Sequence, residues 1–293
     1  MNFDIIEIIP DLSNESYHER DEISSSFIKS VAIHSVYHAL HDEIDNMAAL
    51  EFGDYFHRSM EGCLDETTEV FDDSDIKRQI YEAEYKDNPK YAGESPQKLM
   101  DKNIPMTNDY KQWDYEERQK ISKDLIKAND KSKILKMRDN VLQDEIVSQM
   151  MSQYDYIDEL SVIAVDRESG IHVRVRPDRL FYDKGGDPLN PLFWKCVIDW
   201  KTTTDITKVA KSVFKYRYDL QSIFYCDVLG IDYSNFYFTF VEKQLQHEVQ
   251  NVTISKDNTI DRAIKDMELA FKDIERYLTT GDTRRSAQQI LEL

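Results

Sequence analysis

The 293-residue sequence predicts a mixed α/β fold, in which helices pack on a mixed β-sheet and a mainly helical portion precedes that sheet. Three short β-branched runs, "ELSVIAVD", "HVRVRPDRLFY" and "KCVIDWKT", follow one another with turn signals between them. Segments with helical spacing come before and after these runs, and 41% of the residues are hydrophobic, enough for a sizeable core. We therefore expect one domain over residues 1–293, with a mainly helical portion at 1–150 and a core containing the β-meander at 151–293.

The predicted elements of the first half are mostly helices. Serines that suit an N-cap precede apolar residues at helical spacing from Phe27 onward, and a second helix is expected over about 46–62. Prolines and a glycine interrupt the polar stretch 84–113, which indicates an ordered excursion or a mobile loop. A long amphipathic helix or helix pair is expected over about 115–152.

After the meander, the pattern alternates between helices and strands. It predicts a helical segment near 205–213, a helix over about 218–229 and a closing helix over about 257–279. Between the last two helices, "NFYFTFVE" and "QHEVQNVTIS" are typical of strands. Helices would thus flank the sheet.

The charge of the chain is strongly uneven. Its formal net charge is −19, which argues against a nucleic-acid partner, because such proteins usually carry a basic surface. However, residues 118–138 contain eight Lys or Arg against two acids, whereas residues 61–75 contain seven acids and no base. This asymmetry allows one basic face on an acidic body, although solvated helix faces of either sign would look the same.

Other features bound the location of the chain and its metal chemistry. No apolar run is long enough to span a bilayer, and the N-terminus is acidic where a signal peptide would be basic, so we expect a cytoplasmic protein without a membrane partner. Cys63, Cys196 and Cys226 are far apart, which argues against a disulfide framework or a zinc ribbon and predicts no iron–sulfur cluster.

One group of charged residues stands on the predicted strands. Asp199 and Lys201 alternate with Trp200 in "CVIDWKTT", so both charges share one face of a strand that otherwise looks buried. Asp178 ends "RVRPD" on the preceding strand, and a hairpin would bring it beside Asp199. Two neighbouring carboxylates repel each other unless a cation lies between them, and Mg²⁺ or Mn²⁺ suits such oxygen ligands. The alternative is a structural Asp–Lys pair on a sheet.

Several segments resemble the PD-(D/E)xK nucleases, and among them the RecE-type exonucleases (exonuclease VIII) of phages and prophages. "ELSVIAVDRESGIHVRVRPDRL", "VIDWKTTTDI" and "KYRYDLQSIFYCD" follow the order of that family's pattern, and "LEFGDYFHRSMEG" is similar to its Phe-Gly-x-x-Phe-His element. The resemblance covers roughly residues 50–62 and 158–230 and is weak over 63–150. It implies a restriction-endonuclease-like core.

The resemblance also implies roles for individual residues. His57, Asp178, Asp199 and the backbone carbonyl of Trp200 would ligate Mg²⁺ or Mn²⁺, as two ions, and Lys201 would orient the attacking water and stabilise charge on the phosphate. By periodicity alone, His57 would be a surface or core histidine of a helix. An imidazole ligand suits Mn²⁺ better than Mg²⁺.

Further candidates depend more heavily on the resemblance. Gln221 and Tyr225 are four residues apart on a predicted helix and share a face, and the family places both near the catalytic site, although helix packing would explain them as well. Glu159 matches a family carboxylate but would look the same as a surface strand residue. Five basic residues are candidates for holding the DNA backbone: Arg174, Arg176, Lys208, Lys215 and Arg217.

The activity implied by the resemblance is metal-dependent hydrolysis of phosphodiester bonds from the ends of double-stranded DNA, in the 5′ to 3′ direction, during phage-type recombination. Its implied partners are DNA ends, a RecT-like single-strand annealing protein and further copies of the chain. Two alternatives remain. One is another branch of the superfamily, either an endonuclease or a helicase-associated end-processing nuclease; the other is a catalytically silent acidic protein that binds a host protein.

Overall fold

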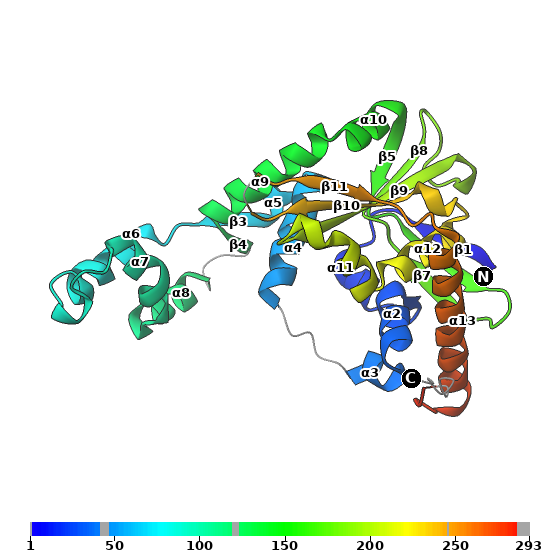
Figure 1. Ribbon diagram of the computed structural model, residues 1–293, viewed down its shortest axis with the longest axis horizontal. Helices are drawn as coiled ribbons and strands as arrows, with labels where there is room; N and C mark the ends of the chain where they lie inside the picture. The colour runs from blue at the N-terminus through cyan, green and yellow to red at the C-terminus, as the bar shows by residue number, and fades with distance from the viewer. Residues whose placement is uncertain (1, 42–46, 119–122, 245, 286–293) are drawn as a thin grey trace. The chain divides into compact units, whose positions relative to one another are not determined.

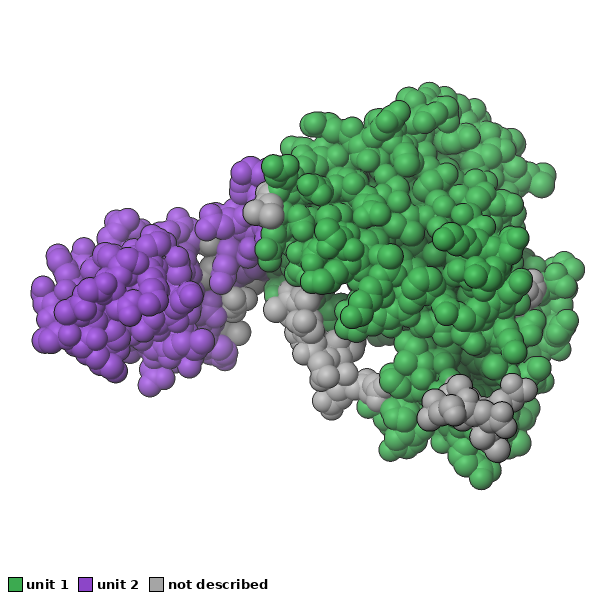
Figure 2. Space-filling view, in the orientation of Figure 1, with its two compact units in different colours: residues 1–57, 137–293 green, residues 58–136 purple. Residues whose placement is uncertain are grey.

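A computed structural model describes residues 2–41, 47–118, 123–244 and 246–285. The chain divides into two compact units, residues 1–57 with 137–293 and residues 58–136, which Figure 2 colours separately. The sequence predicts one domain with a helical portion at 1–150; in the structure, the unit that holds the large sheets also includes the first 57 residues. None of the described helices is long and apolar enough to cross a membrane.

The first unit contains two sheets. The strands of the four-stranded sheet, in spatial order, are β1 (Phe3–Ile9), β6 (Ser161–Asp166), β7 (His172–Val175) and β2 (Ile23–Ser24). Those of the five-stranded sheet are β11 (Val249–Val252), β10 (Phe236–Glu242), β9 (Trp194–Thr203), β8 (Arg179–Asp183) and β5 (Tyr154–Asp158). Both sheets are mixed, since β9 pairs with β10 in parallel and β2 with β7 in parallel, while the other pairings are antiparallel.

Helices flank these sheets (Figure 1). The helices of the unit are α1 (Asn14–His18), α2 (Ser25–Ile33), α3 (Val36–His41), α4 (Met47–Glu61, which continues into the second unit), α9 (Ala128–Gln143, which begins in the second unit), α10 (Glu145–Gln153), α11 (Val209–Lys215), α12 (Tyr218–Leu229) and α13 (Asp257–Thr280), with 3-10 turns η5 (Pro191–Phe193), η6 (Ile206–Lys208) and η7 (Tyr233–Asn235). α12 is buried along almost its whole length and packs against α2, α13 and β1. The predicted α/β class with helices on mixed sheets is confirmed.

One predicted strand is divided in the structure. "HVRVRPDRLFY" forms β7 and β8, and these belong to different sheets, so the expectation of one continuous meander is wrong. The break falls at Arg176, Pro177 and Asp178, where proline lacks the N–H that a central strand needs. The strand β1 was not predicted either, although it pairs antiparallel with β6.

The second unit has a small core of its own. Its strands β3 (Thr68–Phe71) and β4 (Asp124–Lys127) pair in parallel. Its helical elements are α5 (Leu64–Thr67), α6 (Ser74–Ile80), η1 (Tyr81–Tyr85), η2 (Pro89–Tyr91), α7 (Pro96–Lys98), η3 (Leu99–Asn103), η4 (Ile104–Met106) and α8 (Asn108–Arg118). Ile80, Tyr85, Leu99, Ile104 and Tyr110 are buried together.

The proline-containing stretch 84–113 is therefore a series of short helical turns. Pro89, Pro96 and Pro105 each stand at the first or second position of such a turn. Proline suits this position, because the first amides of a helix have no partner within the helix and its φ is already helical. The prolines thus start these turns and are not the interruptions expected from the sequence. The expected helix over 115–152 is likewise divided, by β4 and by the start of α10.

Candidate metal centre

The predicted hairpin brings Asp178 against the strand that carries Asp199. β8 and β9 pair antiparallel with Arg179 opposite Ile198, so Asp178 stands just before the paired region. Its Oδ2 accepts a hydrogen bond of 2.6 Å from the backbone N–H of Trp200. One carboxylate oxygen is thereby anchored to β9, and the other is directed to different neighbours.

The imidazole of His57 lies at the same place. It projects from α4, and its Nε2 is 3.0 Å from the carbonyl oxygen of Trp200, while its Nδ1 is 3.6 Å from Oδ1 of Asp178. The side chain of His57 is 28% exposed, so a ligand from solvent can reach it. The structure therefore brings together a helix histidine, the carboxylate of Asp178 and a backbone carbonyl, which are three of the four ligands implied by the resemblance. The fourth, Asp199, is not in the group of His57, Glu159 and Asp178 whose ligand atoms have metal-ligand spacing.

Glu159 completes a group of three. It precedes β6 and has a φ of 54°, in the left-handed region that residues other than glycine seldom adopt. Ligand atoms of His57, Glu159 and Asp178 all lie within 4.8 Å of one another, and no other such group occurs among the residues that the structure describes. Backbone strain of this kind is concentrated at functional sites, because the surrounding structure must hold it in place.

The pKa of Asp178 is raised to about 6 from its ordinary value of 3.8, and burial is the largest cause. The charge of Asp199 also raises this pKa, whereas His57 and Lys201 oppose the rise. Asp178 and Asp199 are thus close enough to repel each other. A divalent cation would relieve this repulsion and match the charge of the carboxylates.

Asp199 is enclosed by cationic and amide groups. The residue is 3% exposed, and its Oδ1 forms an ion pair with the ammonium group of Lys201. Its Oδ2 accepts a hydrogen bond of 2.6 Å from Nε2 of Gln221 on α12. Burial by itself would lower the pKa of Lys201, but the charges of Asp199 and Asp178 raise it further than burial lowers it, so this lysine stays charged.

Lys29 is a site residue that the sequence analysis missed. Its Nζ donates a hydrogen bond of 2.8 Å to Oε1 of Gln221, and it lies 5.5 Å from the ring centroid of Tyr218. Lys201 Nζ lies 5.3 Å from the same centroid. Burial, and then the charge of Lys201, lower the pKa of Lys29 to about 8, against the opposing effect of Asp199. A signal was present, because Lys29 is the one charged residue in "SSFIKSVAI".

Tyr225 shares the buried face of α12 with Gln221, but its hydroxyl has another partner. It donates a hydrogen bond of 3.3 Å to the backbone carbonyl of Arg176. Its ring packs edge-on against Phe236 at a centroid distance of 5.7 Å. Burial raises the pKa of Tyr225 well above its usual value, so the hydroxyl stays neutral.

Two of the arginines predicted to contact DNA instead contact the N-terminal segment around Tyr17. Arg174 donates to the backbone carbonyl of Glu22 at 2.5 Å, and its guanidinium lies 5.1 Å from the ring centroid of Tyr17. Arg176 lies 4.1 Å from the same centroid and pairs with Glu159 at 2.7 Å. These contacts orient Glu159, and they leave little of either guanidinium for a phosphate.

Lys208 and Lys215 lie nearer solvent. The side chain of Lys208 is 70% exposed and pairs with Asp205 at 2.7 Å. Lys215 is exposed, with its Nζ 3.3 Å from the hydroxyl of Tyr216. Both ammonium groups can therefore meet a ligand from solvent.

Arg217, by contrast, forms part of the packing of α12. It has a φ of 54° at the N-cap of this helix and pairs with Asp219 at 3.1 Å and Asp266 at 2.8 Å. Asp219 has no exposed area, and its buried charge is matched by Arg217 and Arg262. Arg217 therefore links α12 to α13.

The residues at the centre fit a divalent cation. The donors are two carboxylates, one imidazole and one peptide carbonyl, a set dominated by the oxygen ligands that Mg²⁺ and Mn²⁺ prefer, with a nitrogen ligand that Mn²⁺ accepts more readily. Ligand atoms around a six-coordinate ion of this size lie about 3 to 4.3 Å apart. The observed separations within 4.8 Å require only small shifts of the side chains.

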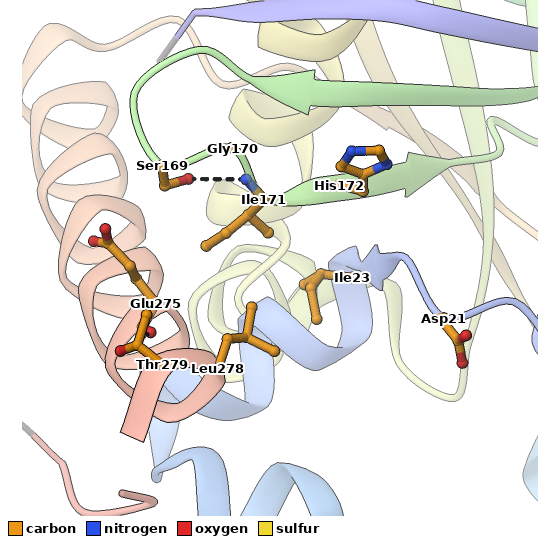
Figure 3. A pocket seen from close by; sticks show the side chains of 9 residues that line it. All are labelled: Asp21, Ile23, Ser169, Gly170, Ile171, His172, Glu275, Leu278 and Thr279. Atoms are coloured by element: carbon orange, nitrogen blue, oxygen red, sulfur yellow. Dashed lines mark hydrogen bonds between the residues drawn. The ribbon is translucent and has the colours of Figure 1, made fainter. Parts of the chain in front are cut away.

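A separate pocket lies between the β6–β7 turn and the last turns of α13 (Figure 3). It has a volume of about 290 Å³ and is lined partly by Ile23, Ile171 and Leu278. Asp21 and His172 also line it, but neither belongs to a described group with metal-ligand spacing. The carboxylates of the metal centre are not among its lining residues, so the pocket is distinct from the predicted site.

Comparison with known proteins identifies the family to which the chain is similar. Residues 24–289 match the model of a PDDEXK-like domain of unknown function, DUF3799. Among solved structures, the chain is similar to a candidate exonuclease from Eubacterium rectale, with 17% sequence identity, 96% of this chain and 91% of that chain covered, and a TM-score of 0.55. At this identity, the similarity shows the fold. No curated protein matches the sequence.

Proposed function

The chain belongs to the family of PDDEXK-like domains of unknown function, DUF3799, and on this premise we propose that it is a metal-dependent deoxyribonuclease. The observation that carries the proposal is the convergence of His57, Glu159 and Asp178 beside the carbonyl of Trp200, with Asp199 and Lys201 on the adjoining strand. An inert scaffold has no reason to hold repelling carboxylates next to a charged lysine in a partly buried place.

The proposed roles follow from the positions of the side chains. His57, Asp178, Asp199 and the Trp200 carbonyl would hold Mg²⁺ or Mn²⁺, as two ions, and Glu159 would supply a further carboxylate. Such an ion lowers the pKa of bound water and neutralises charge on the phosphate. Lys201, which stays charged, would orient the attacking water and stabilise the negative charge that develops on the phosphoryl group.

The proposed substrate is the end of a DNA duplex, degraded in the 5′ to 3′ direction. Support comes from the resemblance to RecE-type exonucleases and from the fold shared with the Eubacterium rectale protein described as a candidate exonuclease. By the same analogy, the enzyme would act in phage-type recombination with a RecT-like annealing protein and would form a homo-oligomer. An acidic exterior around a basic channel would reconcile this substrate with a net charge of −19.

A linear duplex with different dyes on its 5′ and 3′ ends tests the proposal. We expect loss of the 5′ label as mononucleotides or short products with Mn²⁺ or Mg²⁺, and full-length DNA with a chelator. A covalently closed circle in a parallel reaction should stay intact. If folded protein leaves the linear duplex whole with both metals, the proposed activity is excluded; cleavage of the circle would instead point to an endonuclease.

Two variants link the activity to the described residues. Asp199→Ala should abolish cleavage, whereas Asp261→Ala, on the exposed side of α13, should cleave as the wild type does. Circular dichroism and thermal melting establish that both variants are folded. Cleavage by Asp199→Ala at the wild-type rate would show that a contaminating nuclease or another site is responsible.

A further inference from the structure

The side chains around Tyr218 form a closed ring of contacts. Lys29 donates to Gln221, and Gln221 donates to Asp199. Asp199 pairs with Lys201, and the two lysines lie 5.5 Å and 5.3 Å from the ring centroid of Tyr218. Four of these residues come from α12 or β9, and Lys29 alone of the five comes from the N-terminal helix α2.

The hydrogen-bonding capacities of these groups decide how Gln221 is oriented. A lysine ammonium group only donates, so the amide atom that faces Lys29 must be Oε1. An ionised carboxylate only accepts, so the atom that faces Asp199 must be Nε2. Both ends of the amide are therefore specified, and without Lys29 only one end would be held.

We propose that Lys29 is a positioning residue, which acts through Gln221 to hold the carboxylate of Asp199 in the orientation needed for metal binding and cleavage. This inference rests on the proposed nuclease function, and it adds a residue from α2 to the site. Within the described part of the chain, the hydrogen-bond partner of Lys29 is Gln221 and not a member of the group His57, Glu159 and Asp178, so its effect must pass through Asp199 or its neighbours.

The surroundings of Lys29 support a role beyond stability. It is partly buried on a helix whose other residues are apolar or small and polar, and burial lowers its pKa to about 8. A lysine held in this way opposes folding, because its charged form loses hydration. Groups retained at such a cost are concentrated at functional sites.

The variant Lys29→Met keeps most of the side-chain volume and removes the donor. We expect its kcat on linear duplex DNA to fall about 10- to 100-fold, with KM for DNA changed less than about threefold. Mn²⁺ affinity, measured by calorimetry without DNA, should fall about three- to tenfold. The matched control Lys265→Met, on an exposed position of α13, should leave all three values unchanged.

A double-mutant cycle tests whether Lys29 acts through Gln221. If it does, Lys29→Met combined with Gln221→Ala should be no slower than Gln221→Ala alone, because the shared interaction is already lost. Effects that multiply would overturn the proposal. A rise in KM with unchanged kcat would also overturn it, since that result indicates a direct contact of Lys29 with DNA.

The calorimetric result separates this inference from the proposed function. If wild-type protein cleaves no DNA yet binds Mn²⁺, the proposed function fails, and weaker Mn²⁺ binding by Lys29→Met still supports the positioning role. Unchanged Mn²⁺ binding together with unchanged cleavage in Lys29→Met rejects the positioning role alone. Should Lys29→Met not fold, Lys29→Gln supplies the same comparison, because its shorter side chain cannot reproduce the reach of lysine.

Discussion

Asp178 and Asp199 are both next to Trp200 of β9, the first through a hydrogen bond and the second along the chain, yet their surroundings differ. Asp178 shares its neighbourhood with another carboxylate, Glu159, and with the imidazole of His57. Asp199 is more deeply buried, at 3% exposure, but it has an ion pair with Lys201 and a hydrogen bond from Gln221. Glu159 is paired with Arg176, and the ion-pair neighbour of Asp178 is the imidazole of His57, whereas Asp199 is paired with the ammonium group of Lys201.

The difference indicates which of the two carboxylates depends more on a bound cation. A buried charge that is paired and hydrogen-bonded is tolerated, whereas neighbouring carboxylates without a cation shift their pKa toward the neutral form. The pKa of Asp178 is raised first by burial and then by the charge of Asp199. We infer that a bound cation stabilises the charge of Asp178 most. The carboxylate of Asp199 is already paired and oriented by Lys201 and Gln221 before a metal binds.

Removing either member of the Asp199–Lys201 ion pair should have the largest effect on the cleavage rate. Asp199→Ala and Lys201→Ala are each expected to lower the cleavage rate at least about 1000-fold, because the first removes a metal ligand and the second removes a charge that stabilises the transition state. Single-turnover cleavage of a labelled duplex measures the change. Activity within tenfold of the wild type in either variant would contradict the assigned roles.

Neutralising the two aspartates should change stability in opposite directions. In the presence of a chelator at pH 7.5, Asp178→Asn should raise the free energy of unfolding by about 1–3 kcal/mol. The reason is that it removes a charged carboxylate whose surroundings favour the protonated form. Asp199→Asn should lower it by about 2–3 kcal/mol, because the charge of Lys201 loses its partner. Urea titrations measure both values, and equal shifts of the same sign would refute the comparison.

The pH dependence of the metal-free protein should reveal Asp178. Its folded pKa is raised to about 6 from 3.8, so between these values the folded protein keeps a proton that the unfolded chain releases. Its contribution to stability is therefore fully present below about pH 4 and declines as the pH rises to about 6. The difference between Asp178→Asn and the wild type should grow across this window and then level off. A difference that is constant from pH 4 to 7 would place the titration elsewhere.

The smallest effect is expected for Tyr225. Its hydroxyl donates to the carbonyl of Arg176 and is not hydrogen-bonded to Asp178 or Asp199. Tyr225→Phe should cost about 1 kcal/mol of stability and change kcat less than about tenfold. Thermal melting and steady-state cleavage measure the two quantities. A loss of activity as large as that of Asp199→Ala would return Tyr225 to the catalytic group.

Much of the fold and of the site could be predicted because the patterns are local. The alternation in "CVIDWKTT" places Asp199 and Lys201 on one face, and the structure shows their ion pair. The hairpin that brings Asp178 to Trp200 was predicted from two neighbouring strands and a turn. The helices α4, α12 and α13 were predicted from apolar spacing and lie within a residue or two of the expected bounds.

The remainder depends on contacts between distant parts of the chain. The separation of β7 from β8 into two sheets could not be read from a run that looks like one strand. The contacts of Arg174 and Arg176 depend on the N-terminal segment. The carbonyl acceptors of Arg174 lie more than 150 positions before it in the sequence. A basic residue in a sequence shows its charge but not whether an internal acceptor already uses it.

By itself, the sequence determined which residue types alternate on the strands, and with them the Asp-x-Lys pair and the hairpin that faces it. Only the tertiary structure decided that Glu159 joins His57 and Asp178, and that Lys29 reaches Gln221 across 192 positions. The physical reason is range. Backbone periodicity acts over a few residues, whereas the balance of charge around a buried carboxylate is set by every element that packs against it.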